Sequence, residues 1–334
     1  MLTWPDDTTP WYDLPSVQVC YVRIISEIAK HEKVLLVTTN PMDAMVRIMA
    51  IMAAESIPVD LGMVQFAQCP INDTWSRDHG PIAVWGDDGE KFIYDFIFNG
   101  WGLKFASNLD NQITKTIFMD GNFDPDVLCV DMRPFVLEGG SIDTDGAGTL
   151  LTTTSCLTSL NRNEYLTREE IEGELCQAFG LERVLWLENG SIEGDDTDGH
   201  VDILARFCSK DTIAYCSCDD PDDVNFLPLK KMEKQLRSFR TLEGKPYKLI
   251  PLPLPEPIFL EGERLPASYA NFLILEDAVL VPGTGGDELE RQALSALQEA
   301  FPTRKVSAVD CRPLLSGHGG LHCVTMQLPE GYMR

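Results

Sequence analysis

Apolar residues along this chain occur in two kinds of pattern that alternate with each other. An apolar run at 33–39 is followed by a stretch of helical periodicity that starts near Pro41, and then by a second apolar run at 59–64. Short apolar runs predict buried strands, and the periodic stretch predicts an amphipathic helix. Its methionines recur at helical spacing, so we expect them in the core. They are Met42, Met45, Met49 and Met52.

The order strand, helix, strand then recurs, giving five copies at intervals of roughly 60 residues. The later copies are predicted at 92–96, 111–119 and 127–131; at 149–152, 168–179 and 184–187; at 212–215, 222–239 and 247–250; and at 278–281, 287–300 and 306–309. Copies two and five also share letters, since Val130–Pro134 reads VDMRP and Val309–Pro313 reads VDCRP.

Such units cannot bury their apolar faces alone, so they should pack side by side. The pattern predicts an α/β fold in which five modules close into a ring, as one domain spanning 1–334. An open doubly wound sheet is the alternative, but neither a G-x-G-x-x-G motif nor a P-loop follows the first strand.

Residues able to carry chemistry follow the second strands of four copies: Asp78, Glu138, His200 with Asp202, and Cys323. A ring would turn these loops toward its axis. Cys323 in a Gly-rich loop suits a thiolate nucleophile, and an imidazole beside carboxylates suits proton transfer to a cationic substrate. We expect His200 and Asp202 to face one side of an extended segment. Each residue alone has a plainer interpretation: an inert thiol, a salt bridge of Asp78 with Arg77, or a turn cap by Glu138.

Metal binding is a second hypothesis for some of the same residues. His318, His322, Cys323 and His200 are zinc-ligand types, but the adjacent His322 and Cys323 would point to opposite faces of a strand. We therefore do not expect a zinc site. The acidic runs Asp195–Asp196 and Asp219–Asp223 lack the EF-hand pattern and are interpreted as solvated loops. The stretch Pro251–Pro257 is interpreted as a structural loop rather than as a PxxP ligand.

Composition limits the kinds of binding partner that we expect. The formal net charge of -25 argues against nucleic acid and anionic lipid as partners, because both would be repelled. Ten scattered cysteines favour reduced thiols, and the first residues do not form a signal peptide, so a cytoplasmic location is expected. The expected partner is a small cationic substrate; a homo-oligomer is one option on which the sequence is silent.

Six motifs, in order, resemble the agmatine deiminase and bacterial-type peptidylarginine deiminase family, which belongs to the guanidino-group-modifying superfamily with the five-bladed α/β-propeller, or pentein, fold. These motifs span nearly the whole chain, and Trp4–Pro5 near its start also resembles the opening of the family's sequences. The six are Trp75–Pro81, Phe98–Gly102, Leu137–Ile142, Asn161–Asn163, Thr197–Asp202 and Gly319–Cys323.

The resemblance implies a role for each site residue. Asp78 and Asp202 would hold the guanidinium, Glu138 would orient His200, and Cys323 would attack the guanidinium carbon. His200 would protonate the departing ammonia and later activate water, without metal or organic cofactor.

Trp75 would line the pocket around the substrate's alkyl chain, with a core position as the alternative. Agmatine is the leading substrate. An arginine or peptidyl-arginine deiminase is an alternative, since the sequence does not place Arg77, Arg133 and Arg162, any of which could bind a carboxylate. An amidinotransferase and a non-catalytic binder are further alternatives. Gly320 and His318 also depart from the Asn and Gly that many agmatine deiminases carry there.

Overall fold

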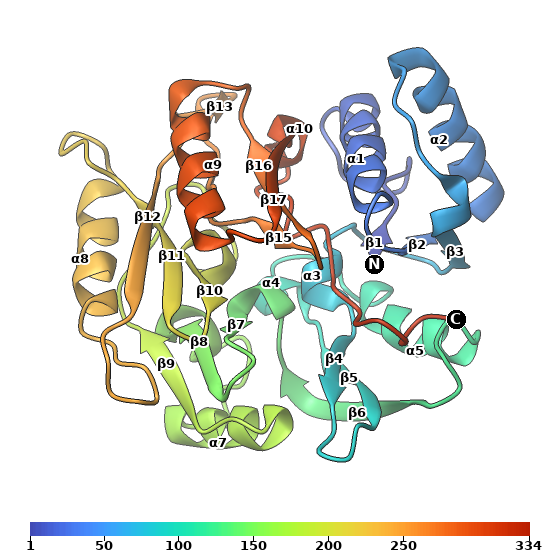
Figure 1. Cartoon of the computed structure of the whole chain (residues 1–334). Coiled ribbons are helices and arrows are strands. Elements are labelled where there is room, and N and C mark those ends of the chain that lie inside the picture. Colours follow the sequence, from blue (N-terminus) through green and yellow to red (C-terminus); the bar gives the residue numbers. More distant parts are fainter. The chain divides into compact units, whose positions relative to one another are not determined.

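The computed structural model describes all residues 1–334 and has an α/β fold (Figure 1). Two compact units make up the chain. The first contains Met1–Gly139 and His322–Arg334, and the second contains Gly140–Leu321. The expectation of one domain over 1–334 stays a prediction. No helix in the structure combines the length and apolar character that crossing a bilayer requires.

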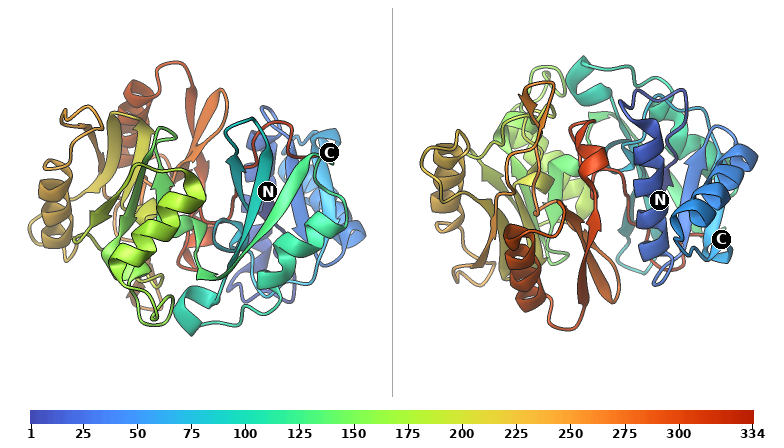
Figure 2. Two further views of the ribbon diagram at one scale, coloured as in Figure 1. Left: turned by 90° about the horizontal axis from the view of Figure 1, so that it is seen from below. Right: turned by 90° about the horizontal axis from the view of Figure 1, so that it is seen from above.

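The first unit contains two three-stranded sheets, ordered β1-β2-β3 and β4-β5-β6. Within it, α1 and α2 lie side by side (Figure 2). Its strands are β1 (Leu2–Thr3), β2 (Val34–Thr38), β3 (Val64–Gln68), β4 (Ile82–Trp85), β5 (Lys91–Ile97) and β6 (Val127–Val136). Its α-helices are α1 (Leu14–Ile28), α2 (Pro41–Glu55), α3 (Ser76–His79), α4 (Gly100–Leu103) and α5 (Ile113–Met119), and its 3-10 helices are η1 (Leu61–Met63) and η2 (Asp110–Gln112).

The second unit contains three three-stranded sheets, ordered β7-β8-β9, β10-β11-β12 and β15-β16-β17, and the small hairpin β13-β14. Its strands are β7 (Ile142–Thr144), β8 (Thr149–Thr153), β9 (Arg183–Leu187), β10 (Ala205–Ser209), β11 (Thr212–Ser217), β12 (Lys248–Pro253), β13 (Phe259–Leu260), β14 (Glu263–Arg264), β15 (Leu273–Ile274), β16 (Ala278–Gly283) and β17 (Lys305–Asp310). Its helices are α6 (Thr154–Leu157), α7 (Arg168–Phe179), α8 (Phe226–Leu236), α9 (Glu288–Ala300), α10 (Arg312–Leu315) and the 3-10 helix η4 (Val201–Ile203), while η3 (Gly139–Ser141) spans the boundary between the units.

The five predicted strand–helix–strand copies are confirmed. In every three-stranded sheet the middle strand pairs in parallel with the third, and a helix connects the two. Parallel pairs need such a crossover. The helix α7 matches the prediction residue for residue, because Thr167 and Glu170 form a capping box and Gly180 ends the helix in the left-handed conformation.

Each sheet also has a first strand that the pattern did not predict. These strands are β1, β4, β7, β10 and β15, and all but β1 pair antiparallel with the middle strand. They are two to five residues long, which is too short to show clear alternation. Three of these strands, β4, β7 and β10, matter for the site, because each begins a few residues after Asp78, Glu138 or Asp202.

Several predicted boundaries were wrong, among them that of the helix expected at 222–239, which forms only over Phe226–Leu236, and two have a local cause. The strand expected at 59–64 begins only at Val64, because Asp60 accepts a hydrogen bond from the N–H of Gly62 and caps η1. The Pro-rich loop expected from Pro251 is partly strand, since β12 runs to Pro253. Pro251 and Pro253 are tolerated because β12 is an edge strand, in which only alternate residues donate hydrogen bonds to the neighbouring strand. Leu254, for example, donates to the Ser217 carbonyl.

The expectation that the methionines of α2 are core residues was wrong, because none of the four is buried. Met42 is 66% exposed and Met49 is 53% exposed. Ala44, Ile48 and Ile51 fill the buried face instead. The spacing of the methionines correctly predicted a helix. It did not identify the buried face, because apolar residues lie almost all round this helix.

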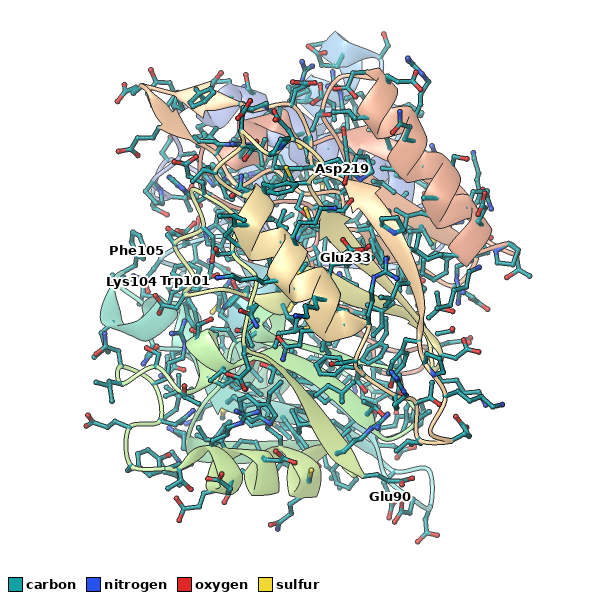
Figure 3. All side chains as sticks on the ribbon, turned by 90° about the vertical axis from the view of Figure 1, so that its left-hand side faces the viewer. Glu90, Trp101, Lys104, Phe105, Asp219 and Glu233 are labelled. Carbon is teal, nitrogen blue, oxygen red and sulfur yellow. The ribbon has the colours of Figure 1, made fainter.

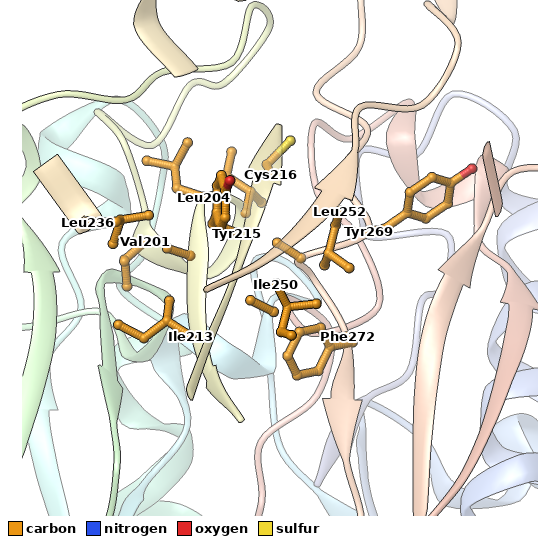
Figure 4. Close-up of a cluster of buried hydrophobic side chains, with 14 of the residues drawn as sticks. Val201, Leu204, Ile213, Tyr215, Cys216, Leu236, Ile250, Leu252, Tyr269 and Phe272 are labelled. Atoms are coloured by element: carbon orange, nitrogen blue, oxygen red, sulfur yellow. The ribbon is translucent and has the colours of Figure 1, made fainter. Parts of the chain in front are cut away.

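The core of the second unit supports the segment that carries His200 and Asp202 (Figure 4). Val201 and Leu204, which flank Asp202, are fully buried and belong to the same cluster as Ile213 and Tyr215. The ten cysteines are all free, which confirms the expectation of reduced thiols. Burial raises the pKa of Cys208 and of Cys216 to about 12.

Candidate active site

Asp78 is a buried carboxylate on the short helix α3 in the first unit. The indole Nε1–H of Trp101 donates to its Oδ2 over 3.0 Å. A buried carboxylate needs donors, and a guanidinium is the cation whose geometry suits one best.

Arg77 joins the segments that carry three predicted site residues. Its backbone N–H donates to the carbonyl of Cys323 over 3.0 Å, and its Nε donates to the carbonyl of His322 over 3.4 Å. A Cβ built on Gly139 would lie 2.2 Å from the Arg77 carbonyl oxygen, so only glycine fits after Glu138. The first unit therefore brings the segments of Asp78, Glu138 and Cys323 together around one residue.

The segment after Cys323 is anchored in the same unit. Thr325 forms a bridge with Leu2, and both its N–H and its hydroxyl donate to the His322 carbonyl over 3.0 Å. The amino terminus donates to the Met326 carbonyl over 2.7 Å. Cys323, which is buried, is thus held in a tight turn against the chain's first strand.

Trp75 is also buried and packs against Trp11, with ring centroids 5.2 Å apart. It precedes α3 directly, so it lies three residues from Asp78 in the chain. A wall of the substrate pocket stays a prediction for this residue.

His200 and Asp202 are both buried in the second unit. The expected extended segment was wrong, because Val201–Ile203 forms the 3-10 helix η4, closed by a bond from the Leu204 N–H to the Val201 carbonyl. The turn places Val201 and Leu204 together in the core, which an extended strand would not do.

The carboxylate of Asp195 organises the loop before His200. Asp195 accepts from the N–H and the hydroxyl of Thr197 through Oδ1, over 3.0 and 2.5 Å, and from the N–H of Gly199 through Oδ2, over 2.8 Å. The Thr197 hydroxyl oxygen in turn accepts the His200 N–H over 3.0 Å. The interpretation of Asp195 as part of a solvated loop was therefore wrong.

The strand β8 and helix α6 hold the other side of this loop. The hydroxyl of Thr153 donates to the Gly199 carbonyl over 2.6 Å, and a Cβ on Gly199 would lie 2.7 Å from the hydroxyl of Ser155. Gly199 has a φ of 96°, which also favours glycine. The thiol of Cys156 lies within 4.8 Å of a ring nitrogen of His200.

The sequence pattern missed Asn271. Its Nδ2 donates to the Asp202 carbonyl over 3.5 Å, and the hydroxyl of Ser268 donates to the Ile203 carbonyl over 2.6 Å. A Cβ on Gly320 would lie 2.5 Å from the Oδ1 of Asn271. Asn271 therefore lies between the Asp202 turn and the glycines that precede Cys323.

Asn271 shares its position in the fold with three predicted site residues. Asp78, Glu138, Asp202 and Asn271 each lie a few residues before the first strand of a sheet, namely β4, β7, β10 and β15. Cys323 lies just before Thr325, which bridges β1. Asn271 is the member of this series from the fourth copy, in which the sequence pattern predicts only a Pro-rich loop.

The arginines that the sequence left unplaced are engaged inside their own units. The side chain of Arg162 is fully buried and donates to Asp198 over 2.7 Å and to the Thr197 carbonyl over 2.9 Å. Arg133 pairs with Asp131 on the surface, as Arg312 does with Asp310 in the matching VDCRP stretch. His318 is also occupied, with Nδ1 2.8 Å from the Gly194 carbonyl oxygen.

Comparisons with known proteins agree with one another. The family described as Porphyromonas-type peptidyl-arginine deiminase matches residues 1–329. A "Putative agmatine deiminase" of Legionella pneumophila (strain Paris) is 32% identical over 341 residues, which cover 99% of this chain and 92% of the relative.

Two solved structures extend the comparison. One of a "Putative Arginine Deiminase" from Porphyromonas gingivalis has a TM-score of 0.91 and 46% identity, and covers 100% of this chain and 96% of its own. A cysteine-to-serine variant of the C. jejuni agmatine deiminase with substrate bound has a TM-score of 0.86 and 37% identity, covering 97% and 91%. Since the family match extends over nearly all of the sequence, the chain belongs to the Porphyromonas-type peptidyl-arginine deiminase family and is a guanidino-group hydrolase.

Proposed function

We propose that this enzyme hydrolyses agmatine to N-carbamoylputrescine and ammonia. The observation that carries the proposal is the contact of Arg77 with Cys323, which ties a thiol nucleophile to the residue beside the buried carboxylate of Asp78. A guanidinium held by that carboxylate would present its central carbon to a nearby sulfur. The names of the Legionella and C. jejuni relatives support the same substrate.

The proposed reaction has two halves. The Cys323 thiolate forms a C–S bond to the guanidinium carbon, and one C–N bond then breaks as His200 donates a proton to the leaving ammonia. The remaining thiouronium is attacked by water, from which His200 takes a proton. The C–S bond breaks, and the ureido product and the thiolate are released. One water is consumed for each ammonia formed.

The carboxylates would hold the cation through both halves. Asp78 and Asp202 would accept the guanidinium N–H groups, and Glu138 would orient His200. We further propose the five-bladed propeller arrangement, in which five modules surround one axis. The five sheets of like order support this arrangement. It would turn the first-strand loops, including that of Asn271, toward one site.

Arginine or a peptidyl arginine is the second candidate, favoured by the family description and the name of the P. gingivalis protein. Both substrates carry a carboxylate or a peptide group beside the alkyl chain. A carboxylate would be bound by an arginine, and the sequence leaves three candidates for that role. All three contact groups of the protein in the structure: Arg77, Arg133 and Arg162. This favours agmatine, whose far end is an ammonium.

The test measures ureido product and ammonia from agmatine, L-arginine and a peptide ending in arginine. We expect the highest kcat/KM for agmatine and no turnover by Cys323→Ala. Turnover that persists in Cys323→Ala would contradict the mechanism, whereas a preference for arginine would contradict only the substrate. Ammonia release that requires an added acceptor amine would indicate an amidinotransferase, and binding without turnover would indicate a non-catalytic binder.

The partner and the location remain proposals of the same kind. A small cationic substrate is supported by the net charge of -25. A cytoplasmic location is supported by ten free thiols, which oxidising compartments would not preserve.

A further inference from the structure

The segment Gly100–Leu103 is a left-handed helical turn. Its four residues all have positive φ, at 70°, 55°, 80° and 67°. Backbone bonds of 3.0 Å from Leu103 to the Asn99 carbonyl and from Lys104 to the Gly100 carbonyl close the turn. Two of the four residues, Trp101 and Leu103, are not glycine, so the conformation is strained.

Local contacts hold this turn against its strain. The Oδ1 of Asn99 accepts the Gly102 N–H over 3.0 Å, and a Cβ on Gly100 would lie 2.2 Å from the Phe105 carbonyl oxygen. Trp101, Lys104 and Phe105 lie together in this segment (Figure 3). A strained turn that is so well supported indicates that its geometry has a use.

The indole of Trp101 is the group that this geometry orients. Phe98 packs edge-on against it with centroids 4.9 Å apart, and Phe105 does so at 5.5 Å. Between these rings the indole is clamped with its N–H directed at the Oδ2 of Asp78, 3.0 Å away. Trp101 and Asp78 are both buried.

We propose that Trp101 is a positioning residue for Asp78. Its N–H donates to Oδ2 and fixes the rotation of the carboxylate that would hold the guanidinium; this role rests on the proposed function. The donor is neutral, which matters because a lysine or arginine in its place would cancel the charge that attracts the cation. The strained backbone conformation of Trp101 is then explained by its role, because that conformation holds a neutral donor at a fixed angle to Asp78.

Trp101→Phe tests the proposal, because phenylalanine keeps a ring between Phe98 and Phe105 but lacks the N–H. We expect kcat/KM for agmatine to fall roughly ten- to hundredfold, as for a lost hydrogen bond to a charged group. The acidic limb of the pH profile should move to higher pH, because the carboxylate loses a donor that favours its ionised form. Agmatine binding to Cys323→Ala should weaken by a similar factor when Trp101→Phe is added.

Trp85→Phe is the matched control. Trp85 is half exposed and packs edge-on against Tyr332, so the same chemical change should leave kcat/KM and the pH profile unaltered. If Trp101→Phe lowers the melting temperature, Leu103→Gly is added, since glycine relieves the positive φ at a side chain that is 73% exposed. The double variant should keep the shifted pH profile.

A second measurement does not need turnover. The Trp101 indole ¹H–¹⁵N resonance should shift in Asp78→Asn and when agmatine binds Cys323→Ala. If the wild type deiminates agmatine and Trp101→Phe has the same kcat/KM and pH profile, this inference is overturned and the proposed function is not. A wild type that releases ammonia from no guanidine would contradict the proposed function and, with it, the inference.

Discussion

The backbone N–H of Arg77 donates to the carbonyl oxygen of Cys323 over 3.0 Å, although 246 positions separate the two residues in the chain. Asp78 follows Arg77 directly, so the carboxylate and the thiol belong to one locally connected piece of structure. The chain passes between its two units at Gly139–Gly140 and at Leu321–His322, next to Glu138 and Cys323.

Asp78→Asn should remove most of the activity, because an amide cannot neutralise a guanidinium. Truncating one partner of a buried charge pair costs roughly 2–5 kcal/mol. Since tenfold corresponds to about 1.4 kcal/mol, kcat/KM should fall at least about thirtyfold. Steady-state kinetics and calorimetry of agmatine binding to the Cys323→Ala background measure the loss. Asp131→Asn, which removes a surface partner of Arg133, should change neither, and an equal loss in both variants would contradict a specific role for Asp78.

Asp195→Ala should impair catalysis without contact with the substrate. The change removes the acceptor of three hydrogen bonds that shape the loop from Thr197 to His200. We expect kcat to fall while KM changes little, and the free energy of unfolding to drop by about 1–3 kcal/mol. Asp219→Ala is the control, because that side chain is 91% exposed. A change in KM alone would argue against positioning of His200.

Asp110 should make stability depend on pH. Burial is the main cause that raises the pKa of this carboxyl to about 7, although it accepts hydrogen bonds from the N–H groups of Asn72 and Asp73. Between its ordinary pKa of 3.8 and about 7 the folded chain binds more protons than the unfolded one, so stability falls as pH rises through that window.

Asp110→Asn should remove this component, which amounts to at most about 1.4 kcal/mol per pH unit. Denaturant unfolding of both proteins from pH 4 to pH 8 gives the difference in free energy at each pH. That difference should change steadily with pH up to about 7 and then level off. A constant difference would contradict the raised pKa of Asp110.

Two glycine-to-alanine changes should act in opposite directions. Gly139→Ala places a Cβ 2.2 Å from the Arg77 carbonyl oxygen, so the backbone around the site must move, and both stability and kcat/KM should drop. Gly173→Ala adds a methyl in open space inside α7 and should stabilise by roughly 0.5–1 kcal/mol with unchanged activity. Melting temperatures and steady-state rates check both, and an active, stable Gly139→Ala would rule out the close contact.

The sequence by itself determined the features that depend on neighbouring residues. The capped helix α7, the five strand–helix–strand copies and the loops that carry Asp78, Glu138, His200, Asp202 and Cys323 all follow from local spacing and composition. Local patterns suffice there because periodicity and capping act over a few residues.

Tertiary structure alone decided the rest. Ala44 and Ile48, not Met42, face the core of an almost uniformly apolar helix, since burial depends on which side the neighbouring elements cover. Asn271 gains its place from a bond to the Asp202 carbonyl, and Trp101 gains its place from a bond to Asp78. These hydrogen bonds join positions far apart in the chain, and no local pattern of residues encodes them.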